Sequence, residues 1–155
     1  MNGKAVILHV EDDPNDVVLV GMAFRKSGAP VTLQVVNDGE QAVRYLSAEG
    51  PYSNRKTFPR PSLVLLDLKL PRRSGLEVLS WVRSREDLRR LPIVMLTSSS
   101  QPNDVNRAYD LMANSYLVKP SGLDDLTELV KKVSHYWLEM NIKPVFGDDD
   151  PLSAA

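Results

Sequence analysis

Polar residues that could carry out chemistry together stand at four separate points of the chain, each directly after a short apolar run. They are Glu11 and Asp12, then Asp67, Thr97 and Lys119. Three carboxylates in one small space repel one another unless a cation lies between them, and oxygen ligands without nitrogen or sulphur favour Mg²⁺ or Mn²⁺. Such a cation would neutralise a phosphate donor and let an aspartate attack the phosphorus, which gives an aspartyl phosphate.

Within this hypothesis each residue has a role. Asp12 and Asp67 would be direct metal ligands, Glu11 would reach the cation through a water, and the main-chain carbonyl of Lys69 would complete the protein ligands. Thr97 would donate a hydrogen bond to the new phosphoryl group, and Lys119 would offset its charge.

Each of these residues also has an ordinary structural explanation when it is considered alone. The aspartates before Pro14 are typical of a helix cap, and Asp67 is typical of a turn after a strand. Thr97 precedes three serines and could belong to a simple loop, and Lys119 could be a surface charge. The chemical interpretation therefore depends on whether the fold brings the residues together.

The rest of the chain predicts such a fold, because apolar runs alternate with stretches of helical periodicity. Predicted strands are residues 5–10, 31–36, 63–66, 93–96 and 115–118, and predicted helices are 14–26, 40–48, 76–84, 103–112 and a last one from 123. This alternation indicates an α/β fold with an open parallel sheet. Since ligands of such sheets bind at the carboxyl ends of the strands, the polar residues should form one acidic pocket with one lysine.

Composition excludes several other classes of protein. The formal net charge of −1 gives no basic field for nucleic acid or an anionic membrane surface. No stretch approaches the ~20 apolar residues of a membrane span, and the first residues lack a signal-peptide pattern, so we expect a cytoplasmic protein. Cysteine is absent, which excludes disulfides and thiolate chemistry.

Five motifs, in order along the chain, resemble those of the response-regulator receiver family. They are VEDDPND at 10–16, LLDLKLP at 65–71, SG at 74–75, VMLT at 94–97 and YLVKP at 116–120. The resemblance covers residues 4–139 and implies a flavodoxin-like α/β fold, in which a five-stranded parallel sheet carries helices on both faces. It also implies that a sensor histidine kinase phosphorylates Asp67 in a Mg²⁺-dependent reaction. Glu11 stands where the family usually has aspartate, and its longer side chain favours a water-mediated metal contact.

The resemblance further implies a switch made of Thr97 and Tyr116, a conserved role for Lys119, and a cis peptide bond between Lys119 and Pro120. Tyr116 could equally be an ordinary strand aromatic with its hydroxyl at the surface. The start of the chain, the basic loop 53–60 and the ending HYWLE at 135–139 are similar to single-domain regulators that partner bacterial phytochrome kinases. We therefore expect a receiver domain over residues 1–140 and a short extension with an acidic run over 141–155, without an output domain.

Two surfaces could bind partners. On the first helix, Val18, Leu19 and Met22 are expected to lie partly outward, where they could receive a kinase or pack against neighbouring elements. The last helix carries an apolar stripe at Leu126, Leu129, Val130, Val133, Trp137 and Met140. The segment that follows contains Ile142, Val145 and Phe146, which could fold back or form a homodimer with a second copy.

Three other functions would each require features that differ from those of this sequence. A haloacid-dehalogenase-like phosphatase would carry a second aspartate two positions after the nucleophile, where this chain has Lys69. A flavodoxin-like cofactor binder would need a Gly-rich phosphate loop after the first strand. A receiver-like module that is never phosphorylated would not need Asp67 together with its acidic pair. The sequence thus predicts a signalling protein rather than an enzyme with turnover.

Overall fold

The computed structural model of the chain describes residues 4–146, and the acidic run at 147–151 lies outside the described residues. Every predicted strand is present, and the bounds are β1 Ala5–Val10, β2 Val31–Val36, β3 Leu63–Leu66, β4 Ile93–Thr97 and β5 Ser115–Val118. All pairs are parallel, and the strand order is β2-β1-β3-β4-β5. The prediction of a flavodoxin-like five-stranded parallel sheet is therefore confirmed.

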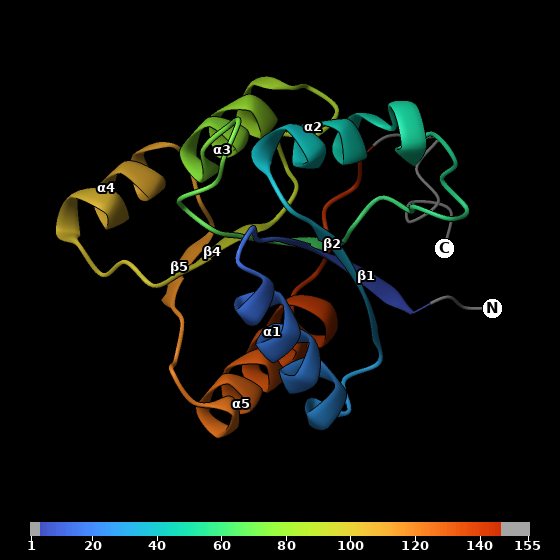
Figure 1. Cartoon of the computed structure of the whole chain (residues 1–155). Coiled ribbons are helices and arrows are strands. Elements are labelled where there is room, and N and C mark those ends of the chain that lie inside the picture. Colours follow the sequence, from blue (N-terminus) through green and yellow to red (C-terminus); the bar gives the residue numbers. More distant parts are fainter. Residues whose placement is uncertain (1–3, 147–155) are drawn as a thin grey trace.

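In the described part of the chain, five α-helices connect or follow the strands and cover both faces of the sheet (Figure 1). They are α1 Pro14–Ser27, α2 Gly39–Ser47, α3 Gly75–Ser84, α4 Pro102–Asp110 and α5 Leu123–Ser134. Helices α1 and α5 lie side by side on one face, and α2, α3 and α4 lie on the other. A 3₁₀-helix, Gly50–Tyr52, follows α2, and a π-helical turn, His135–Met140, follows α5.

Two apolar clusters separate the sheet from these helix layers. The cluster under α1 and α5 includes Ile7, Leu65, Leu96, Phe24 and Val130. The cluster under α2, α3 and α4 includes Leu8, Leu66, Met95, Leu79 and Ala108. All four residues of β3 are buried, as expected for a central strand with helices on both sides.

The predicted stripe on the last helix holds for most of its length and fails at the end. Leu126, Val130 and Val133 are buried, and Leu129 and Trp137 are partly buried against the same cluster. Met140, however, is 61% exposed, so its place in the stripe was wrong. The physical reason is the π-helical turn, whose i→i+5 hydrogen bonds rotate the residues after His135 away from the 3.6-residue period.

After the π-helical turn the chain folds back on its own domain, and Val145 and Phe146 make the contacts. Phe146 packs against the cluster under α2 and α3, and the Arg60 guanidinium lies 5.3 Å from the centre of its ring. Arg90 donates a hydrogen bond of 3.3 Å to the Val145 carbonyl. Ile142, in contrast, is 92% exposed.

Within residues 4–146 no helix has the length and apolar character that crossing a membrane requires.

Candidate functional site

The carboxyl ends of β1 and β3 form the centre of the site, because the strands that follow β1 in sequence lie on opposite sides of it. Strand β2 pairs with one edge of β1, and β3 pairs with the other. This reversal of strand order opens a crevice at the strand ends. Oxygen atoms of Glu11, Asp12 and Asp67 in this crevice all lie within 4.8 Å of one another. The structure therefore brings the predicted acidic residues together.

Glu11 is the most deeply placed of the three carboxylates and has no exposed surface. Its Oε2 accepts a hydrogen bond of 3.1 Å from the Asp13 backbone N–H, and its Oε1 accepts one from the Lys119 amine. Burial raises the pKa of Glu11 to about 7, although the bond to Lys119 opposes this shift. The ammonium group of Lys119 thus stabilises the buried carboxylate of Glu11, and a bound cation would stabilise it further.

Asp67 follows β3 directly, and its backbone and side chain are both fixed. Its Oδ1 accepts a hydrogen bond of 2.7 Å from the Leu68 N–H, and its Oδ2 accepts one of 3.2 Å from Lys119. Helix α3 begins against this strand end, since a Cβ on Gly75 would lie 2.0 Å from the Asp67 carbonyl oxygen. Ser74 and Glu77 close a capping box at the same point, which fixes where α3 starts.

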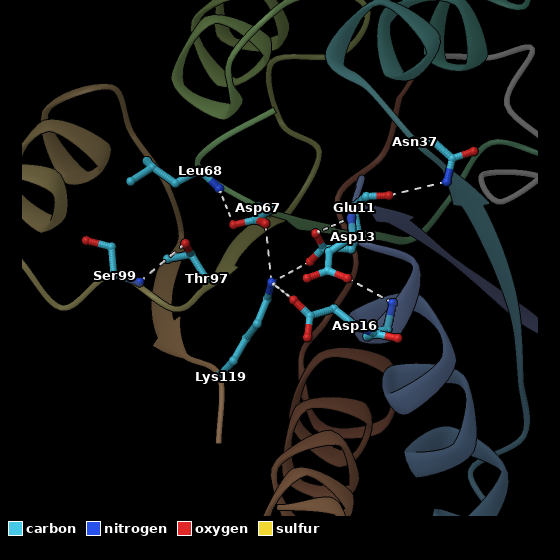
Figure 2. Close-up of polar contacts among 10 residues, drawn as sticks. Glu11, Asp13, Asp16, Asn37, Asp67, Leu68, Thr97, Ser99 and Lys119 are labelled. Atoms are coloured by element: carbon cyan, nitrogen blue, oxygen red, sulfur yellow. Dashed lines mark hydrogen bonds and ion pairs between the residues drawn. The ribbon is translucent and has the colours of Figure 1, made fainter. Parts of the chain in front are cut away.

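Lys119 connects the acidic groups, as Figure 2 shows. Its Nζ donates to Glu11, to Asp16 at 2.9 Å and to Asp67 at 3.2 Å, and its side chain is only 10% exposed. Burial alone would lower the pKa of Lys119, but the bonds to Glu11 and Asp16 outweigh it and hold the pKa above the usual value. Lys119 is thus a buried charge with three anionic partners rather than a surface lysine.

Asp16 was missed because it follows no strand. It lies in the first turn of α1, three residues after the Asp13 cap, where the helix starts beside the end of β1. An acidic residue is common in the first turn of a helix because it complements the helix dipole. Its presence in the sequence therefore gave no reason to expect a contact with Lys119. No local signal in the sequence indicated this contact, because it depends on how the start of α1 lies against Lys119.

Thr97 and Tyr116 are linked through one residue of the loop after β4. Thr97 is buried, and its Oγ1 accepts a long hydrogen bond of 3.5 Å from the Ser99 N–H. The partly buried Tyr116 donates its hydroxyl to the Ser99 carbonyl at 2.9 Å. The Ser99 hydroxyl in turn donates to Asp104 of α4 at 2.6 Å. The Tyr116 hydroxyl is therefore tied to the loop, and its role as a switch stays a prediction.

Two expectations about the neighbouring loops have different outcomes. Lys69 is exposed and lines, with Asp12, a surface cavity of about 540 Å³. The metal-binding role of its carbonyl stays a prediction. The expected cis bond between Lys119 and Pro120 was wrong, because the described residues contain no cis peptide bond. The trans form is the general preference of an X-Pro bond.

The donor set of the acidic cluster fits a hard divalent cation. It consists of carboxylate oxygens without nitrogen or sulphur, which suits Mg²⁺ or Mn²⁺. Glu11 and Asp67 form the buried side of the cluster, and the exposed Asp12 forms its solvent side. The cluster therefore offers the cation a route from water and leaves room for water or phosphate ligands.

His9, two residues before Glu11, is buried and neutral. It lies on β1 between Val35 and Leu65, and neither ring nitrogen has a hydrogen-bond partner among residues 4–146. Burial first, and then the charge of Lys119, lowers the pKa of His9 to about 4. In the unfolded chain this histidine would titrate near 6.5, so acid should favour unfolding.

We predict that His9 makes the fold sensitive to acid. Its contribution is fully present above pH 6.5 and is lost as the pH falls toward about 4, because the unfolded chain then binds a proton that the folded chain does not. The loss should reach about 3 kcal/mol. Urea unfolding at several pH values will show a flatter dependence for His9→Leu than for the wild type. The exposed His135→Leu is the control, and equal pH dependence in all three proteins would contradict the prediction.

Comparisons with known proteins agree with this geometry. The response regulator receiver domain family matches residues 7–131. The response regulator Rcp1 of Synechocystis sp. is 41% identical over 138 residues, which cover 89% of this chain and 92% of Rcp1. The crystal structure of the phosphorylated cyanobacterial phytochrome response regulator RcpA has a TM-score of 0.84 and 37% identity, and covers 92% of this chain and 99% of RcpA. The Mn²⁺-bound form of Rcp1 has a TM-score of 0.79 and 39% identity, over 91% of this chain and 99% of that one. Because the family match spans most of the chain, this protein belongs to the response regulator receiver domain family.

Proposed function

We propose that Asp67 is the phosphoacceptor of this receiver and that a sensor histidine kinase is its donor. The observation that carries the proposal is the position of the Asp67 carboxylate between two other carboxylates and a buried lysine. In the transfer, an Asp67 oxygen forms a bond to phosphorus while the bond from phosphorus to the histidine nitrogen of the donor breaks. The histidine nitrogen keeps the electron pair of the broken bond.

The other residues of the site bind and orient the transferred group. Lys119 faces the Asp67 carboxylate at 3.2 Å and would balance the charge that the phosphoryl group adds. Thr97 is buried at the end of β4 and has a hydroxyl proton to donate. We propose that this hydroxyl turns to the phosphoryl group, and that the shift reaches Tyr116 through the Ser99 contacts.

The cation is proposed to be Mg²⁺, with Mn²⁺ as a substitute. Glu11, Asp12, Asp67 and the Lys69 carbonyl would hold it, and it would neutralise the phosphate oxygens during transfer. We expect acetyl phosphate with Mg²⁺ to give an acid-stable, base-labile phosphoprotein, and chelation of the metal to abolish it. Gel analysis with and without a chelator will measure this. Equal labelling in both samples would contradict the metal's role.

The site supports a signalling protein that catalyses only its own phosphorylation and dephosphorylation. The position two residues after Asp67 holds Lys69, an exposed cation, where a phosphatase of the haloacid-dehalogenase type needs a carboxylic acid. The relatives matched above are likewise response regulators. We therefore propose that its output is a changed interaction surface of the 1–140 domain rather than a chemical product.

We propose a phytochrome-type kinase as the partner, because RcpA is a phytochrome response regulator and resembles this chain over nearly its whole length. On α1, Val18 and Met22 are 58% and 38% exposed, and Leu19 is partly buried. These residues would contact the kinase. A location in the cytoplasm is part of the same proposal.

A homodimer through α5 and residues 141–155 is a further proposal on partners. Met140 and Ile142 are exposed apolar residues that a second copy could cover. Light scattering over a range of concentrations, with the full chain and with a chain ending at residue 140, tests it. Equal monomer masses for both chains would contradict it.

A further inference from the structure

Asp16 contacts the lysine of the site from outside the acidic cluster. Its Oδ2 accepts a hydrogen bond of 2.9 Å from Lys119, and its side chain is 32% exposed (Figure 2). The close-packed oxygen atoms belong to Glu11, Asp12 and Asp67, so Asp16 is not a member of that set. Asp16 therefore binds the lysine without a place among the metal ligands.

Lys119 and a divalent cation compete for the same oxygen atoms. An ammonium group has three N–H donors, and Lys119 directs them to Glu11, Asp16 and Asp67. Glu11 and Asp67 are also the two buried members of the acidic cluster. A cation that binds these carboxylates repels the ammonium and weakens both of its bonds. The bond from Lys119 to Asp16 is the one for which the cation does not compete.

We propose that Asp16 is a positioning residue that holds Lys119 while a divalent cation takes over Glu11 and Asp67. A lysine that is 10% exposed would otherwise keep its charge only by retaining those two carboxylates. With Asp16 present, Lys119 can lose its hydrogen bonds to Glu11 and Asp67 and still keep one anionic partner. It also stays beside Asp67, where the proposed function requires it. The inference rests on the metal site of that proposed function but not on phosphorylation.

Calorimetric titration of the full chain with Mg²⁺ alone tests this role. We expect Asp16→Asn to raise the Mg²⁺ dissociation constant roughly fivefold, in line with the loss of one partly exposed ion pair. Asp16→Glu should restore most of the affinity, because it keeps the charge. Asp13→Asn is the matched control, since it removes a charge from the same helix end while asparagine caps a helix as well as aspartate. It should change the constant less than about twofold.

A double-mutant cycle with Lys119→Met separates positioning from simple charge. If Asp16 acts by holding the lysine, Asp16→Asn will have no effect on Mg²⁺ affinity once Lys119 is gone. Lys119→Gln gives the same comparison if the methionine variant does not fold. An equal effect of Asp16→Asn in both backgrounds, or an equal effect of Asp13→Asn, overturns the inference. Because no phosphoryl donor is present, a failure of the proposed function on Asp67 is distinguishable from a failure here.

Discussion

Asp67→Asn will reduce Mg²⁺-dependent phosphorylation of this chain by about 10³-fold or more, with acetyl phosphate or with a phosphorylated kinase as donor. The amide is a far weaker nucleophile than the carboxylate, and it removes one anionic ligand from the cluster. The fold should survive, because the amide oxygen can still accept the Leu68 N–H and Lys119 keeps Glu11 and Asp16. Labelling rates of protein with an unchanged circular dichroism spectrum measure the effect.

Asp13→Asn serves as control for this variant too. Asp13 accepts a hydrogen bond of 2.9 Å from the Asn15 N–H and caps α1, and it has no contact with Lys119 among the described hydrogen bonds. Its replacement should leave the labelling rate within about threefold of wild type. Persistent labelling of Asp67→Asn, at a rate near that of the control, would mean that another residue accepts the phosphoryl group.

Gly75→Ala will impair both folding and phosphorylation, because a single methyl group collides with the backbone that carries Asp67. The new Cβ would lie 2.0 Å from the Asp67 carbonyl oxygen and 2.9 Å from the Leu68 Cα. These are backbone atoms, so the start of α3 or the end of β3 must move. We expect the free energy of unfolding to fall by about 3 kcal/mol. Folded molecules should be phosphorylated about 10²-fold more slowly, since a shift of ~1 Å misplaces the nucleophile.

Gly21→Ala is the matched control, with an expected effect of opposite sign on stability. Gly21 lies inside α1, and a Cβ there would meet only the end of the Arg25 side chain at 3.5 Å. Alanine is favoured over glycine in a helix, so the unfolding free energy should rise by about 1 kcal/mol. Urea unfolding and initial phosphorylation rates of the two variants give the comparison. A Gly75→Ala protein with wild-type stability and rate would refute the proposed role of this close approach.

The strands and most helix starts could be predicted because their signals are local. Runs such as 63–66 are apolar throughout, and Asp13-Pro14 and Ser74-Gly75 place the caps of α1 and α3 within a residue. The end of one helix was placed two residues too late. Helix α4 ends at Asp110 rather than at the expected residue 112. Met112 has a left-handed φ of 72°, which a methionine in the sequence gives no reason to expect.

The acidic residues of the site could be predicted because each follows a strand, and parallel strands end at one edge of a sheet. Asp16 and Ser99 could not, since their contacts depend on how α1 and the loop after β4 approach Lys119 and Tyr116. Met140 was misplaced because no local pattern predicts a switch from α- to π-helical hydrogen bonding. These features arise from tertiary packing rather than from local sequence.

The most direct measurement of the central claim is the location of the phosphoryl group. The wild-type chain would be phosphorylated with acetyl phosphate and Mg²⁺, treated with borohydride to reduce the acyl phosphate to an alcohol, and digested for mass spectrometry. We predict the reduced residue at Asp67, with Asp12 and Asp16 unmodified in the same sample. Modification of a different carboxylate, or a protein that is labelled without any reduced aspartate, would contradict the assignment.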